Sequence, residues 1–161
     1  MPRVESQKPL LPSIIDRLID QNPDVSIEPQ WARAQSLRQY ELGVLRDVEA
    51  MLNTRQTRQW MSEEFKESIQ SVLTFGLPDL TAASMGQDDC ERLRRAVELA
   101  LERFEPRIRQ VSVRMRDRES DNERTLRMVI EGILWVDPDP QPITFDTVVH
   151  PQSGQCTIQT R

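Results

Sequence analysis

The sequence predicts an α+β domain in which N-terminal helices are followed by an antiparallel β-meander packed on the helices. Between residues 10 and 105, apolar side chains recur every three or four positions, which is the spacing of amphipathic helices. From Val111 onward the period changes to two, which is typical of half-exposed strands. Because the helical segments come first and the strands last, the order of elements indicates an α+β fold.

The length, charge and hydrophobic content of the chain indicate which kinds of molecule it can bind. A chain of 161 residues is long enough for one domain with a single core plus a tail. It has 21 basic and 26 acidic residues, and the net charge of −5 argues against nucleic acid as a partner. The hydrophobic content of 37%, with 5% aromatic residues, is lean for a self-sufficient enzyme and favours a surface completed by partner proteins.

The two cysteines, Cys90 and Cys156, do not form a disulfide framework, and no CxxC spacing occurs. The chain opens with polar residues and has no apolar run that approaches the ~20 residues of a membrane span. We therefore expect a cytoplasmic protein without membrane insertion.

We expect residues 1–28 to form an N-terminal tail with a short amphipathic helix, and residues 29–161 to form a single α+β domain. The short helix covers Leu10–Asp20. Its apolar face consists of Leu11, Ile14, Ile15, Leu18 and Ile19.

Three further helices are expected, at Pro29–Asn53, at Ser62–Leu73 and from the N-cap Asp88 to Glu105. The last one stops at Glu105 because Pro106 disfavours the helical conformation of the residue before it. The inward residues are Leu37, Tyr40, Val44, Leu45, Val48, Met51 and Leu52 in the first helix, Phe65, Ile69, Val72 and Leu73 in the second, and Leu93, Val97, Ala100, Leu101 and Phe104 in the third.

Four strands follow, at about 110–117, 126–135, 143–149 and 155–160. Trp135 ends the second strand and is expected in the core. The segment Asp137–Pro142 contains three prolines, so we expect a rigid connection outside the hydrogen-bonded ladder.

The corner Glu105-Pro106-Arg107 breaks a local rule. Helix C-termini favour cations, because the last carbonyl groups leave partial negative charge there, yet Glu105 places an anion at this end. A position that breaks a local rule is a candidate for function or for a structural ion pair. Two interpretations stay open: a partner-binding corner, and a buried tie between Glu105 and Arg107.

The two edges of the expected sheet differ. Arg114 and Arg116 blunt the first edge strand, as charged side chains do in many β proteins. The last strand, around Thr157 and Ile158, carries no charge before Arg161 and no proline. Such an edge suits a subunit that accepts a partner strand, so Thr157 and Ile158 are candidate partner-binding residues.

Several sequence blocks occur together in a specific order. They are Ser36–Leu37, Val44–Glu49 leading into Leu52–Arg55, Ser71–Leu73 with Phe75–Leu80, Phe104–Arg107, Ile130–Pro138 and Thr144–Val148. In these blocks the chain, over about residues 36–154, resembles the TssE family of type VI secretion baseplate subunits. That family is shared with a wedge protein of contractile phage tails and is often labelled lysozyme-like. Phe75 stands where a tyrosine is usual.

The resemblance implies an α+β fold and a structural role in the baseplate wedge beside the TssF, TssG and TssK subunits. It also implies a part in starting growth of the sheath, whose proteins are TssB and TssC. The Glu105-Pro106-Arg107 corner is the signature of the family and is implied to contact the wedge core. Sheath subunits link through exchanged strands, which points to the 155–160 edge as the template.

An enzymatic interpretation finds little support in the residues. Glycoside hydrolysis needs two carboxyl groups, one of them kept protonated, whereas Arg107 favours the ionised form of Glu105 and no second carboxylate is singled out. His150 is the sole histidine and precedes Pro151 in a turn. Neither a catalytic triad nor a metal-ligand set nor a phosphate loop is present, so no cofactor is expected. We expect a non-enzymatic assembly subunit; the alternatives are a peptidoglycan hydrolase and a regulatory binding module on the same fold.

Overall fold

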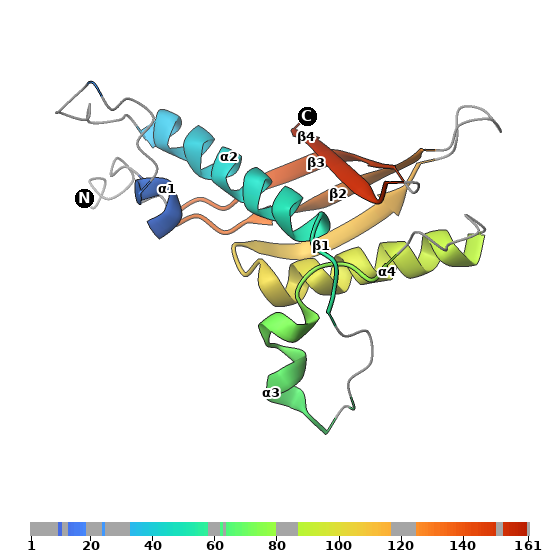
Figure 1. The fold of residues 1–161 in the computed structure, drawn as a ribbon. Coiled ribbons are helices and arrows are strands. Elements are labelled where there is room, and N and C mark those ends of the chain that lie inside the picture. The colour runs from blue at the N-terminus through green and yellow to red at the C-terminus, as the bar shows by residue number, and fades with distance from the viewer. Residues whose placement is uncertain are drawn as a thin grey trace. The chain divides into compact units, whose positions relative to one another are not determined.

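The C-terminal part of the chain is organised by one antiparallel sheet whose strands lie in chain order, β1-β2-β3-β4. The computed structural model describes residues 10, 13–18, 24, 33–57, 62, 64–79, 87–116, 125–150 and 153–160. The strands are β1 (Ile108–Met115), β2 (Leu126–Leu134), β3 (Gln141–His150) and β4 (Gln155–Thr160). The helices are α1 (Ile14–Leu18), α2 (Arg33–Leu52), α3 (Lys66–Ile69), the 3-10 helix η2 (Val72–Thr74) and α4 (Gln87–Phe104), as Figure 1 shows.

This order confirms the predicted α+β fold, with helices first and a four-stranded meander last. The chain divides into two compact units, Met1–Asp47 and Val48–Arg161, so that α2 runs from the first unit into the second. The first nine residues of the predicted N-terminal tail lie outside the described residues.

The core of the second unit lies between α4 and one face of the sheet. Helix α4 runs along β1 (Figure 1), and its residues Leu93, Val97, Ala100 and Leu101 are buried as predicted. Inward-facing residues of the sheet and the last turn of α2 complete this core; they include Val48, Met51, Leu52, Val113, Met128, Ile130, Phe145, Val149, Cys156 and Ile158.

The predicted end of α4 is also confirmed, since its last residue is Phe104. The helix begins at Gln87, so Asp88 lies in its first turn and is not the N-cap.

In the first unit, α1 is oriented by its polar residues. Asp16 Oδ1 accepts a hydrogen bond of 2.6 Å from Arg46 Nη1 on α2, and Ser13 Oγ caps the turn by accepting from the amide of Asp16. The side chain of Asp16 also lies against Gly43, where a methyl group would crowd it. As a result Ile14, Ile15 and Leu18 of the predicted apolar face are exposed, while Leu11 and Ile19 lie outside the described residues.

The predicted helix Ser62–Leu73 is wrong. The structure contains only the four-residue α3 and then η2, and no residue of α3 is buried. Ser71 explains the break, because its Oγ donates to the carbonyl of Ser68 and accepts from the amide of Leu73, which starts the 3-10 turn. Phe65, Val72 and Leu73, which were predicted to face inward, are exposed.

Two predictions at the end of β2 are also wrong. Trp135 lies beyond the strand and is 50% exposed, so it is not a core residue. Gln141 and Pro142 pair with Leu134 and Ile133, so the proline-rich segment does enter the ladder. Pro142 is tolerated because β4 pairs with β3 only from Phe145 onward, which leaves the start of β3 as an edge.

A β-bulge in β1 was not predicted. The register with β2 shifts between Arg109 and Ser112, and Gln110 takes a positive φ of 54° at the shift. Gly132 lies opposite, where any side chain would meet Ile108 and the carbonyl of Arg109. The glycine in the Ile130–Pro138 block therefore permits the bulge that turns the chain out of the Glu105 corner.

Candidate partner-binding sites

The Glu105 corner joins α4 to β1 without a loop. The amide of Glu105 donates to the carbonyl of Leu101 at 2.9 Å, which completes the last helical turn. The amide of Ile108 then donates to the carbonyl of Glu105 at 3.1 Å, and β1 begins at that residue. Pro106 is exposed at the tip of the corner. The chain reversal therefore takes only three residues, and Glu105 anchors both of its sides.

Glu105 and Arg107 form a two-point ion pair. Arg107 Nε donates to Glu105 Oε1 at 2.6 Å, and Nη2 donates to Oε2 at 2.5 Å. The amide of Arg107 adds a longer bond of 3.3 Å to Oε1. Glu105 is only 4% exposed, so both oxygens of a buried carboxylate are engaged by the residue two positions on. Two parallel hydrogen bonds between a guanidinium and a carboxylate hold the arginine side chain in one orientation, in addition to pairing the two charges.

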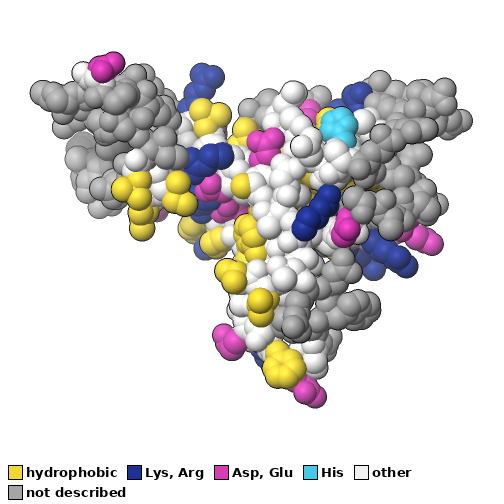
Figure 2. Space-filling model, viewed as in Figure 1, with side chains coloured by type: hydrophobic (Ala, Val, Ile, Leu, Met, Phe, Trp, Pro, Cys, Tyr) yellow, Lys and Arg dark blue, Asp and Glu magenta, His cyan; other side chains and the backbone are white. Residues whose placement is uncertain are grey.

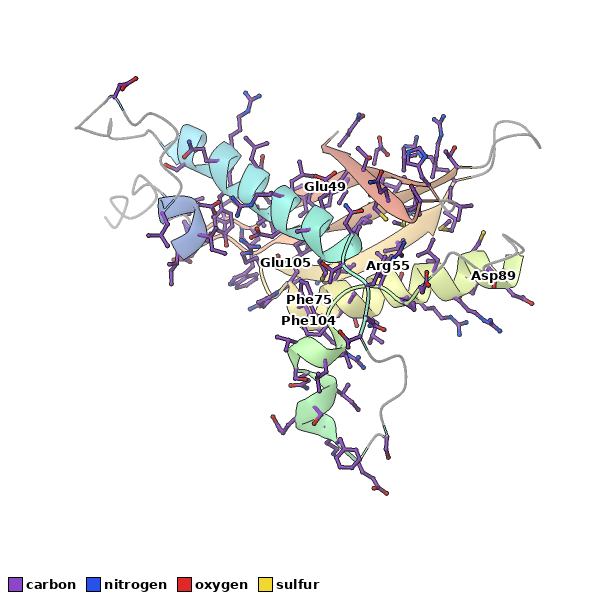
Figure 3. All side chains as sticks on the ribbon, in the orientation of Figure 1. Glu49, Arg55, Phe75, Asp89, Phe104 and Glu105 are labelled. Carbon is purple, nitrogen blue, oxygen red and sulfur yellow. The ribbon has the colours of Figure 1, made fainter. Side chains whose placement is uncertain are left out.

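Aromatic contacts surround this corner. The amide of Trp135 donates to the carbonyl of Arg107 at 2.7 Å, and the guanidinium carbon of Arg109 lies 3.8 Å from the centre of the Trp135 ring. On the helix side, the rings of Phe75 and Phe104 meet edge to face, with centroids 5.3 Å apart and planes at 74° (Figure 3). Pro106, Arg109 and Trp135 are exposed and Arg107 is half-buried; we call these four residues the corner surface.

The edge of β4 is not bare. Asn53, just after α2, receives a hydrogen bond of 2.8 Å from the amide of Cys156 at Oδ1 and donates one of 2.8 Å from Nδ2 to the Cys156 carbonyl. Glu49, one turn earlier on α2 (Figure 3), accepts a longer bond of 3.4 Å from the amide of Ile158. Asn53 thus pairs with Cys156 as a neighbouring strand residue would.

This geometry separates the two candidate residues on β4. Alternate residues of an antiparallel strand direct their amides to the same side. Because the amides of Cys156 and Ile158 face α2, the amide of Thr157 faces β3, opposite Val148. The side chains follow the opposite rule, since Ile158 is buried in the core and Thr157 is exposed.

The other sheet edge is closed in a similar way. Glu98 of α4 accepts a hydrogen bond of 3.0 Å from the amide of Val113 on β1, and Arg94 holds the same carboxylate oxygen at 2.6 Å. Each edge of the sheet therefore has a helix beside it that supplies a carboxylate to an edge amide.

The structure brings Glu105, Pro106 and Arg107 together but leaves them apart from Thr157 and Ile158. The corner lies at the start of β1 and the other two residues lie on β4, and these strands form opposite edges of the sheet. Sequence reasoning missed Glu49, Asn53 and Glu98, because their partners are strand amides with no sequence signal of their own. The one available hint was the polar Asn53 at the end of an amphipathic helix.

We also searched the described residues for a metal site and for a reactive thiol. They contain no group of three or more His, Cys, Asp or Glu side chains that could hold a metal ion. Burial raises the pKa of the Cys156 thiol to about 11, which leaves it protonated and unreactive at neutral pH. Among the helices of the described segments, none is both long and apolar enough to cross a membrane.

Comparisons with known proteins place these features in a family context. A family model described as baseplate wedge protein gp25 matches residues 38–139, which is more than half of the chain. Among solved structures, a chain of "The baseplate complex from the type VI secretion system" is similar with 22% sequence identity and a TM-score of 0.49. That similarity covers 70% of this chain and 95% of the other. Among curated proteins, none matches the sequence.

Proposed function

Because the chain belongs to the baseplate wedge protein gp25 family, we propose that it is a structural, non-enzymatic subunit of a cytoplasmic type VI secretion baseplate. In this role it corresponds to TssE and joins a wedge with TssF, TssG and TssK. The observation that carries the proposal is the family match over residues 38–139, which includes α4, the corner, β1 and β2.

The corner surface is the proposed contact with the wedge core. Glu105 holds Arg107 in one orientation through two short hydrogen bonds, and the chain reversal exposes Pro106. Trp135 adds a large exposed ring beside Arg109, and aromatic residues and arginine are the residue types enriched at binding hot spots. In this proposal Glu105 positions the contact residues, so the structural tie and the interface are two aspects of one corner.

The β4 edge is the proposed template for the first ring of the sheath proteins TssB and TssC. The exposed side chain of Thr157 and the outward amide of Ile158 lie on this edge. The amides of Cys156 and Ile158 already donate to Asn53 and Glu49. An incoming strand therefore has to displace these two side chains before it can pair with β4. Side-chain bonds to backbone groups contribute only about 1 kcal/mol each, so a longer strand ladder can replace them.

A hydrolase is less well supported by the geometry. Both oxygens of Glu105 accept hydrogen bonds from Arg107, so this carboxyl is not arranged to donate a proton to a glycosidic oxygen. The described part of the chain places no second carboxylate in hydrogen-bond contact with Glu105.

A binding experiment tests the proposal. The purified parent protein, mixed with co-expressed TssF and TssG from the same source, should elute with them as one complex in size-exclusion chromatography. The same preparation should show no turnover of peptidoglycan. Cell-wall hydrolysis by well-purified parent protein that is lost in Glu105→Gln, without complex formation, would establish the hydrolase instead.

A further inference from the structure

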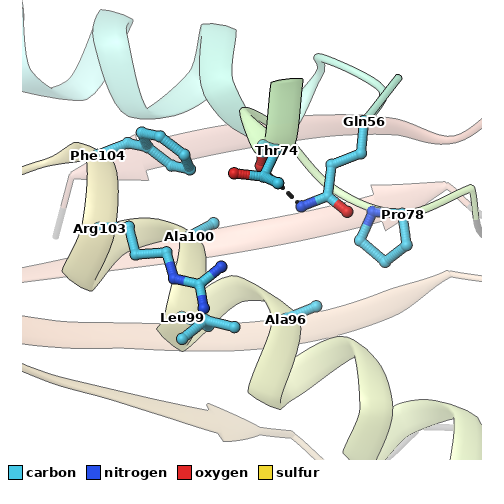
Figure 4. Close-up of a pocket in the computed structure, with 8 residues that line it drawn as sticks. All are labelled: Gln56, Thr74, Pro78, Ala96, Leu99, Ala100, Arg103 and Phe104. Carbon is cyan, nitrogen blue, oxygen red and sulfur yellow. Dashed lines mark hydrogen bonds between the residues drawn. The ribbon is translucent and has the colours of Figure 1, made fainter. Parts of the chain in front are cut away.

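A shallow pocket of about 160 Å³ lies beside the C-terminal half of α4. One wall is α4 itself, with Ala96, Leu99 and Arg103; the other is the connecting chain, with Gln56, Thr74 and Pro78 (Figure 4). The small side chain of Ala96 leaves the space, and Leu99 at the rim is 44% exposed. We call this the α4 pocket.

The connecting-chain wall is held in place by specific bonds. Gln56 Nε2 donates to the carbonyl of Thr74 at 2.8 Å, and the Gln56 amide donates to the carbonyl of Leu77 at 2.9 Å. Gly76 makes this possible, because its φ of 97° lets it approach the Thr54 carbonyl where a Cβ would overlap it. The wall is therefore fixed by residues 75–78, which belong to one of the sequence blocks that carry the family resemblance.

Arg103 differs from the other arginines of α4. Arg92, Arg94 and Arg95 lie within ion-pair distance of Asp89 or Glu91, whereas Arg103 has no acidic partner among the described residues. It is also exposed, and the pocket lining contains no carboxylate. The pocket lining therefore combines apolar side chains, among them Leu99 and Ala96, with the polar groups of Gln56 and Thr74. Arg103 adds a positive charge at the rim that no described carboxylate pairs with.

The apolar character continues onto the neighbouring surface. Val72 and Leu73, which directly precede Thr74, are 83% and 42% exposed. Figure 2 shows hydrophobic side chains at the surface of α3 and η2. Contiguous exposed apolar residues with a polar rim are typical of protein–protein contact sites.

We propose that the α4 pocket binds a partner protein through one apolar side chain, with a carboxylate about one helical turn away that pairs with Arg103. The pocket volume suits a single aliphatic or aromatic anchor, and charge complementarity with Arg103 selects an acidic segment. This inference rests on the proposed function, since the partner is another subunit of the baseplate. The pocket is distinct from the corner surface and gives the wedge a second contact.

Two single substitutions test the pocket on the full chain, with the co-expressed TssF–TssG complex as the probe. Leu99→Asp and Arg103→Glu should each weaken binding roughly tenfold or more, and the Arg103→Glu effect should shrink as salt rises. The matched control is Arg92→Glu, which reverses a charge on the same helix at a side chain that is 82% exposed and should bind as the parent does. Thermal melting identifies any variant that fails to fold; Arg103 is exposed, so its variant keeps the test decisive if Leu99→Asp does not fold.

A photo-crosslinking amino acid at position 99 tests the chemistry of the occupant. The crosslinked partner segment should contain an aliphatic or aromatic residue with Asp or Glu within four positions, and the same label at position 92 should not capture it. Parent-like binding of both pocket variants, or a crosslinked segment without acidic residues, overturns the α4 pocket while leaving the proposed function in place. Failure of the parent protein to bind TssF–TssG overturns both.

Discussion

Glu105 illustrates how one residue can serve stability and recognition together. An anion at a helix C-terminus is unfavourable on its own, and the cost is offset here by the two bonds from Arg107. The sequence predicted this pair as one of two alternatives, because Arg107 lies only two residues beyond Glu105. It could not predict that Trp135 and Arg109 gather at the same corner, since Trp135 arrives from the far end of β2.

Arg107→Ala should destabilise the fold by about 2–3 kcal/mol. This is below the ~3–5 kcal/mol expected when a fully buried ion pair loses one partner, because the Arg107 side chain is 22% exposed and water can reach the orphaned carboxylate. Urea unfolding monitored by tryptophan fluorescence measures the loss. Arg107→Lys is the matched control, because it keeps the charge but cannot form the two-point contact. Its free energy of unfolding should lie between those of the parent protein and Arg107→Ala. Parent-like stability of Arg107→Ala would mean that the tie does not hold the corner.

At the scale of elements, the spacing of hydrophobic residues was the main basis for predicting where the helices and strands lie. Helix α4 and β4 lie where the spacing of apolar residues predicted them, because each buries a continuous stripe against the core. The segment 62–73 failed because its apolar residues have no surface to cover in the second unit, so helical spacing alone was misleading. The caps on both sheet edges come from long-range contacts that local patterns do not encode.

Proline substitutions on β4 should now have unequal effects. Thr157→Pro removes an amide that faces β3 and should unfold or strongly destabilise the sheet. Ile158→Pro removes the outward amide that donates to Glu49 and also shortens a buried side chain, so it should cost less stability than Thr157→Pro but more than Ile158→Val. If this edge is the sheath template, Ile158→Pro should keep wedge binding while sheath assembly from the baseplate falls. Ile158→Val, which trims the side chain but keeps the amide, is the control and should behave as the parent does. Normal sheath assembly by a folded Ile158→Pro protein would exclude this edge.

At the scale of the whole molecule, the three proposed contact surfaces lie at separate places on the second unit. The corner surface flanks one edge of the sheet, β4 forms the other, and the α4 pocket opens beside the helix that covers the core. The outer face of the sheet carries ion pairs that join strands, Arg114 with Glu131 and Arg116 with Asp146, so its charges are largely neutralised internally. If these surfaces bind partners as proposed, the molecule offers several separate contacts, which an assembly subunit requires.

Family and fold class were accessible from sequence because the blocks lie in order along the chain and fix the local turns. The domain division predicted at residue 28 stays a prediction, and the compact units meet within α2. Partner assignment could not follow from sequence, because it depends on which exposed groups remain unpaired after folding. Arg103 illustrates the limit: unlike Arg92, Arg94 and Arg95, it has no acidic residue three or four positions away. Only the structure shows that no described carboxylate from another part of the chain pairs with it either.

The most direct test of the central claim is sheath assembly in cells that lack this protein. With a fluorescently tagged sheath protein, the number of sheaths per cell is counted in the parent strain, in the deletion strain and after complementation with the intact chain. A structural baseplate subunit predicts that sheaths disappear on deletion and return on complementation. Sheath numbers that stay at the parent level in the deletion strain would contradict the account.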